Sequence, residues 1–161
     1  MTEQKPFQLP QRSGQKPDTT RPSLDRPEPH KQISQNAPPD MQEKLFMRAR
    51  SLPGVTVGKS LVSVPGARAF HLDEALARGS KKAFQRGREF AHIHPAHDGS
   101  LHMTLPPAWY EDVLAKGWGE PHPVSGTMMV WGPRNEKELE VVWHLVRVSY
   151  AYATGEYGRD E

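Results

Sequence analysis

Five of the eight histidines in this 161-residue chain lie between residues 92 and 122. They are His92, His94, His97, His102 and His122. Neutral imidazole is a common ligand of zinc, iron, copper and nickel. It also titrates near neutral pH, so clustered rings can act as general base and general acid. This part of the chain is therefore the candidate region for catalysis or metal binding.

The spacing of these histidines predicts a hairpin with one imidazole-bearing face. Residues 90–94 and 101–105 look like strands, and the link between them ends in Asp98-Gly99-Ser100, a hairpin signal. Because alternate residues of a strand share a face, His92 and His94 lie together with Phe90, and His102 lies on the same face of the return strand. The opposite face is apolar and is expected to pack into the core. Its residues are Ala91, Ile93, Leu101, Met103 and Leu105.

Cross-strand neighbours lie about 5 Å apart at Cβ, so the rings of His92, His94 and His102 are expected to meet. We predict these three as catalytic residues and as the candidate metal ligands, with His97, Asp98 and His122 as further catalytic candidates near them in the loops. The alternative is a solvated strand face on which the histidines are merely polar.

Three other residues are predicted to contact a substrate. Trp118 lies in a rigid Gly- and Pro-rich loop and forms either a pocket wall or a cap on the core. Arg134 precedes a helix and binds either an anion or a nearby glutamate. Glu89 adjoins the first histidine strand, where it either fixes the tautomer of a histidine or is simply an exposed charge.

The elements that must position these residues indicate an α+β fold. Helical periodicity and capping signals predict helices over about 40–52, 106–116 and 136–153, the last capped by Asn135. Strands are predicted over 55–64, 67–72, 90–94, 101–105 and 127–131, with a loop over 117–126. We expect a small, mainly antiparallel sheet with about three helices.

Residues 1–39 differ in composition from the rest. They hold eight of the sixteen prolines and few large apolar side chains, so we expect a disordered tail that is dispensable for stability, followed by a domain over 40–161. The net charge of +2 is too small to predict nucleic acid or a membrane as partner. No cysteine, signal peptide or transmembrane segment is present, which fits a cytoplasmic protein.

Several separated motifs resemble one known family. Arg88 to His94, His97-Asp98, Leu101-His102, Lys116 to Gly119, His122-Pro123 and Pro133 to Glu136 resemble, in the same order, the luciferase of bioluminescent fungi. They resemble more closely the bacterial proteins called luciferase-like or luciferase-domain proteins. The resemblance covers residues 88–154 well and 55–87 loosely, and leaves out the tail.

The fungal enzyme oxygenates 3-hydroxyhispidin with molecular oxygen and is not known to need an organic cofactor. The resemblance thus implies an oxygenase acting on a planar, acidic pyrone-like or phenol-like molecule, with oxygen as co-substrate and His92, His94 and His102 at the base of its pocket. A divalent transition metal is the candidate cofactor, and a small molecule is the expected partner. The alternatives are a non-catalytic module that binds a metal or small ligand, and an accessory protein that presents a partner surface.

Overall fold

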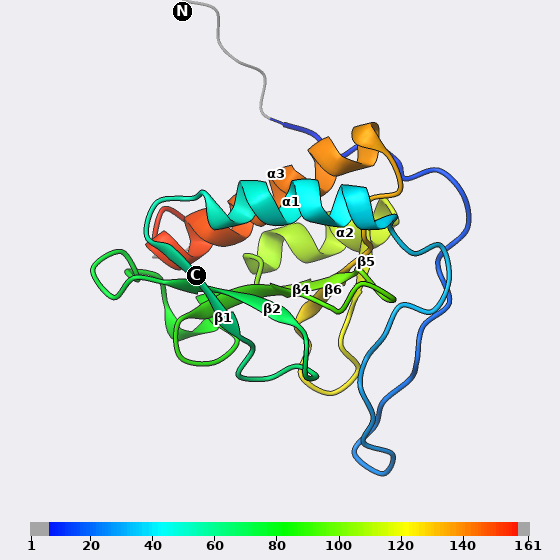
Figure 1. Cartoon of the computed structure of the whole chain (residues 1–161), viewed down its shortest axis with the longest axis horizontal. Coiled ribbons are helices and arrows are strands. Elements are labelled where there is room, and N and C mark those ends of the chain that lie inside the picture. Colours follow the sequence, from blue (N-terminus) through cyan, green and yellow to red (C-terminus); the bar gives the residue numbers. More distant parts are fainter. Residues whose placement is uncertain (1–6, 158–161) are drawn as a thin grey trace, which may run out of the picture.

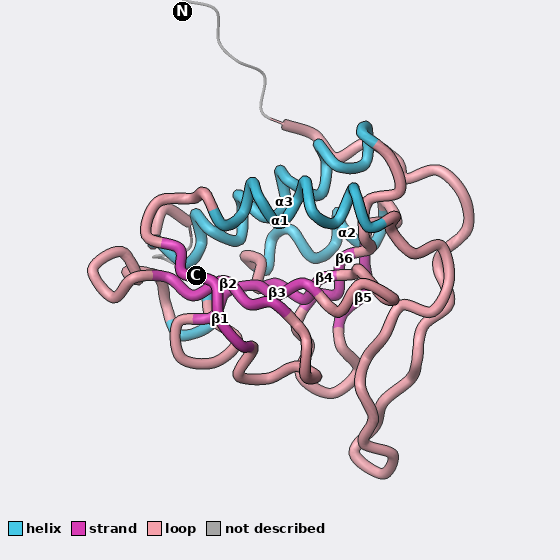
Figure 2. Tube along the Cα trace, in the orientation of Figure 1, coloured by secondary structure: helices cyan, strands magenta, loops and turns pink. Residues whose placement is uncertain are grey.

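The structure is a computed structural model and describes residues 7–157. Along the chain, three α-helices and two 3-10 helices alternate with six strands (Figures 1 and 2). The helices are α1 (Pro39–Arg50), η1 (Lys81–Ala83), η2 (Pro107–Trp109), α2 (Tyr110–Ala115) and α3 (Glu136–Thr154). The strands are β1 (Val55–Lys59), β2 (Arg68–Leu72), β3 (Glu89–Ile93), β4 (Leu101–Met103), β5 (Gly119–Pro121) and β6 (Met128–Val130).

All six strands form one antiparallel sheet in the order β1-β2-β3-β4-β6-β5. The three α-helices lie over one face of this sheet, and loops lie over the other (Figure 1). The core fills the space between helices and sheet, where apolar residues of α1 and α3 meet the strands. The predicted α+β class, the antiparallel sheet and the three helices are confirmed.

Local signals account for the ends of the longest helix. The Asn135 side chain accepts a hydrogen bond from the Glu138 backbone N–H at 3.0 Å, as predicted for an N-cap. The helix ends at Gly155, whose left-handed φ of 87° suits glycine.

One strand was missed: residues 119–121 of the predicted loop form β5, which pairs with β6. Three residues containing a glycine and a proline carry too little alternation to predict a strand.

A bulge in β3 changes which side chains share a face. Phe70 pairs with Ala91 but His71 pairs with Glu89, so Phe90 is an extra residue in β3. Such a bulge interrupts the alternation of side chains. The prediction that Phe90 lies beside His92 is therefore wrong: Phe90 packs in the core, 5.9 Å from the Tyr150 ring of α3.

Residues 7–38 differ from the disordered tail that the sequence predicts. They have almost no regular secondary structure, but they run along the domain and contact it repeatedly (Figure 1). Leu9 is buried in the core cluster, and the Trp118 indole N–H donates to the Pro10 carbonyl at 2.7 Å. The Arg12 backbone N–H donates to the Lys116 carbonyl at 2.9 Å. Hydrogen bonds to the domain, together with the burial of Leu9, hold this stretch, and neither can be read from its composition. Residues 1–6 of the predicted tail lie outside the described residues.

Within residues 7–157, no helix is long and apolar enough to cross a membrane.

Candidate functional site

A row of paired residues across the loop-covered face of the sheet builds the site. In register, Ala69 of β2 pairs with His92 of β3, His92 with His102 of β4, and His102 with Met129 of β6. Met129 in turn pairs with Glu120 of β5. Paired residues share a face of the sheet, so both histidines and Glu120 point away from the helices. The predicted shared face of His92 and His102 is confirmed.

Two of the histidines are held by carboxylates on their outer ring nitrogens. His92 Nδ1 lies 2.8 Å from Glu89 Oε2, and the bulge at Phe90 brings this glutamate to the same side as His92. His94 Nδ1 lies 3.2 Å from Asp98 Oδ2 and 2.8 Å from Ser100 Oγ. A carboxylate on one ring nitrogen fixes the tautomer and leaves the other nitrogen with a lone pair.

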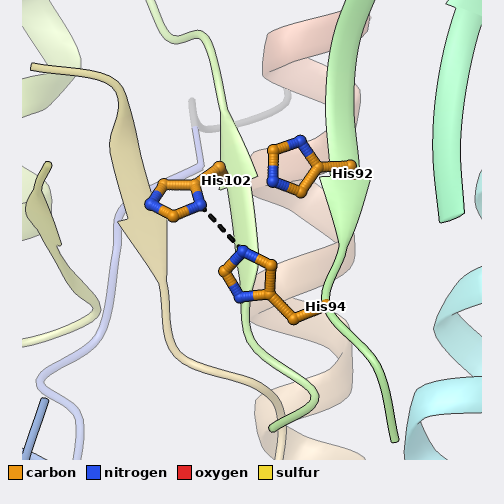
Figure 3. Close-up of side chains that lie close together, drawn as sticks. All are labelled: His92, His94 and His102. Carbon is orange, nitrogen blue, oxygen red and sulfur yellow. Dashed lines mark hydrogen bonds between the residues drawn. The ribbon is translucent and has the colours of Figure 1, made fainter. Parts of the chain in front are cut away.

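His102 is the centre of a cluster of five imidazoles. Its Nδ1 lies 3.0 Å from His94 Nε2, and its Nε2 lies 2.9 Å from Nδ1 of His30. The ring of His92 lies 5.3 Å from that of His102, and the ring of His122 lies 5.8 Å away, between centroids. Figure 3 shows the rings of His92, His94 and His102 converging from the two strands. One nitrogen from each of these three rings lies within 4.8 Å of the others, so the triad could hold a metal ion.

Burial favours the neutral form of His92 and of His102. Burial lowers the pKa of His102 well below its usual value, and the neighbouring imidazoles lower it further. Burial also lowers the pKa of His92, against the opposing effect of its hydrogen bond to Glu89. His92 Nε2 is buried without a hydrogen-bond partner among the described residues. Neutral imidazole is the form that ligates a metal or accepts a proton.

The cluster forms the wall of a cavity of about 550 Å³, a size typical of sites for small organic molecules. Part of the cavity lining is apolar and consists of prolines and valines, namely Pro27, Pro29, Val62, Val64 and Pro95. Its polar side holds the histidines His30, His92, His94, His97, His102 and His122 together with Asp98. The exposed His97 lies at the rim, so the structure brings all six predicted catalytic residues to one cavity.

A comparison with known protein families finds a family that matches part of the chain. Residues 87–149 match the model of the Luciferase domain. The chain therefore has a segment similar to a luciferase domain, which spans less than half of its length. It is similar to proteins named luciferase from Armillaria ostoyae and Neonothopanus nambi, each 38% identical over 78 residues. The luciferase of Armillaria gallica is 37% identical over 78 residues.

Each of these alignments covers 43% of the chain but only 29% of the fungal protein. The chain thus spans less than a third of the length of these relatives. No solved structure matches the chain. The resemblance expected from the sequence motifs is confirmed.

None of the three predicted substrate-contacting residues lines the cavity. Trp118 is buried and donates to Pro10, and Arg134 forms a two-pronged ion pair with Glu138. Arg134 Nη2 also donates to the Ser13 carbonyl at 2.7 Å. Both side chains attach residues 7–38 to the domain, which matches the structural alternative for each. Glu89 reaches the site through His92, as the alternative of a tautomer-fixing carboxylate expects.

Sequence reasoning missed two residues of the site. His30 was assigned to the predicted tail, and Glu120 to the predicted loop, yet His30 Nε2 lies 3.0 Å from Glu120 Oε1 beside His102. A signal for His30 was present, because an isolated histidine among prolines is unusual in a purely solvated linker. Glu120 gave no signal, since its place in the row depends on the register of β5 against β6.

Proposed function

We propose that this luciferase-like protein is an oxygenase for a planar, acidic small molecule of the pyrone or phenol class, with molecular oxygen as co-substrate. The observation that supports it is the cavity over the histidine cluster, because half of the residues that line it, including His92, His94 and His102, lie within the segment that matches the Luciferase domain. A flat ring fits between the prolines and valines on one side and the imidazoles on the other.

His92 is the best-placed general base. His92 lines the cavity, its buried Nε2 has no hydrogen-bond partner among the described residues, and Glu89 lies against the opposite nitrogen. In the proposed reaction, the hydroxyl proton of an enol or phenol moves to Nε2. Glu89 stabilises the imidazolium that forms, and the ligand becomes an electron-rich anion that molecular oxygen can oxidise.

Oxygen uptake with a panel of hydroxylated pyrones and phenols tests this proposal. His92→Gln is expected to lower the rate about 100-fold or more, the usual contribution of a general base. His71→Gln is the matched control, because His71 lies on β2 and does not line the cavity. No uptake above the blank with any compound, or equal rates for both variants, would contradict the proposal.

A second candidate function is the binding of a divalent transition metal by His92, His94 and His102. It is favoured by the converging nitrogens and by the carboxylates behind two of the rings, an arrangement common around metal-bound histidines. Such an ion would supply Lewis acidity or redox chemistry at the base of the cavity. We expect elemental analysis of protein loaded with Co²⁺ and desalted to give about one ion per chain, and far less for His94→Ala.

A small molecule thus remains the proposed partner. The cytoplasmic location and the lack of nucleic-acid or membrane partners remain predictions, which cell fractionation and binding assays can test.

A further inference from the structure

One member of the histidine cluster comes from outside the matched family segment. His30 belongs to the stretch of residues 7–38, and its side chain is fully buried. Its two ring nitrogens make two different contacts: Nε2 lies 3.0 Å from Glu120 Oε1, and Nδ1 lies 2.9 Å from His102 Nε2. His30 thus connects a carboxylate of β5 to the central histidine of the site.

The direction of these hydrogen bonds follows from the carboxylate. An ionised carboxylate only accepts, so the His30 proton is on Nε2 and its Nδ1 carries a lone pair. His102 must then donate from Nε2 to His30, which leaves the lone pair of His102 on Nδ1. That nitrogen faces His94 Nε2 at 3.0 Å.

The same reasoning assigns His94. The Ser100 hydroxyl donates to Asp98 Oδ1, so its oxygen accepts from His94 Nδ1 at 2.8 Å, and the lone pair of His94 is on Nε2. The two facing nitrogens of His94 and His102 both carry lone pairs, and a cation between them satisfies both. Two imidazole nitrogens bound to one first-row metal at about 2.0–2.1 Å lie about 2.9–3.4 Å apart. Their separation of 3.0 Å therefore matches a shared ion.

We propose that His30 is a positioning residue that, together with Glu120, fixes His102 in the tautomer whose Nδ1 ligates a metal. The inference rests on the metal site proposed above for His92, His94 and His102. With it, all three ligands have an outer partner: Glu89 behind His92, Asp98 behind His94, and the His30–Glu120 pair behind His102. The amino-terminal stretch is then a part of the site, and its docking is coupled to metal binding.

Two substitutions of equal polarity separate the two contacts of His30. Asn places its side-chain oxygen near the position of His30 Nδ1, so His30→Asn keeps an acceptor for His102 but loses Glu120. Gln reaches the position of Nε2, so His30→Gln keeps the partner of Glu120 but gives His102 no acceptor. His71→Gln is the control for loss of a histidine elsewhere on the sheet.

Titration of the full chain with Co²⁺, followed by its visible absorption, tests the proposal. His30→Gln is expected to weaken Co²⁺ binding about 10- to 100-fold, as for other outer partners of ligating histidines. His30→Asn and His71→Gln should stay within a few-fold of wild type. Equal affinity for His30→Gln and wild type, with His94→Ala still abolishing binding, would overturn the role of His30 while leaving the metal site intact.

A measurement without metal tests the positioning directly. ¹⁵N chemical shifts of the ring nitrogens report which nitrogen of His102 carries the proton. We expect Nε2–H in the wild type and in His30→Asn, and a shift towards Nδ1–H in His30→Gln. Nδ1–H in the wild type would overturn the proposal, whether or not the protein binds Co²⁺.

Discussion

The docking of the amino-terminal stretch can be tested by one leucine. Leu9 is 7% exposed and belongs to the core cluster, so truncation to alanine removes buried apolar surface. Leu→Ala changes in cores cost about 2–5 kcal/mol, and the edge position of Leu9 favours the low end, about 2 kcal/mol. For a domain of this size, that corresponds to a fall in Tm of about 4–8 °C.

Thermal unfolding followed by circular dichroism measures the effect, and the same stretch offers a matched control. Leu24 is 85% exposed, so Leu24→Ala should change the free energy of unfolding by less than about 0.5 kcal/mol. If both variants unfold within about 1 °C of wild type, the stretch is detached in solution. That result would restore the expectation of a dispensable tail and remove His30 from the site.

Three further predictions concern the sheet, the ion pair and the cluster. Gly119→Ala should destabilise the fold by at least about 2 kcal/mol in urea unfolding. Its new Cβ would lie 2.1 Å from the Met129 carbonyl oxygen, whereas in Gly58→Ala the nearest atom, on the His71 ring, is 3.4 Å away and little change is expected. Burial tends to raise the pKa of Glu138, but its bonds with Arg134 lower it overall. Glu138→Gln should therefore cost about 1 kcal/mol at pH 7, and this difference should shrink as the pH falls from the ordinary carboxyl pKa through the lowered pKa of Glu138 in the folded protein. His102→Ala should abolish ligand binding and also cost about 1–3 kcal/mol, because His102 is buried and its Nε2 is hydrogen-bonded to His30.

The hairpin and its histidines could be predicted because the hydrophobic pattern itself sets the geometry. A slip of one residue would bury His102 in the core and expose Leu101 and Met103, so the register of β3 against β4 follows from the alternation. The last helix was predictable for a similar local reason, since Asn135 and Gly155 mark its two ends. In both cases the decisive interactions lie close together in sequence.

The remainder of the site depends on contacts between distant residues. His30 and Glu120 are 90 positions apart, and His30 and His102 are 72 positions apart. Composition alone suggests disorder for a stretch with so many prolines, because the amino-acid content of a segment does not show which backbone hydrogen bonds it makes to the rest of the domain. The bulge at Phe90 is likewise invisible in the sequence, because it arises from the pairing of β3 with β2.

The order of the strands bears on how a shortened version of this protein would behave. The family-matched segment, 87–149, contains β3, β4, β5 and β6 but not β1 and β2. Cutting the chain there would make β3 an edge strand, although all five of its residues are buried in the whole protein. Its free backbone groups, flanked by apolar side chains, would present a template for pairing with other molecules. We expect a fragment limited to 87–149 to aggregate, because β2 would no longer cover the edge of β3.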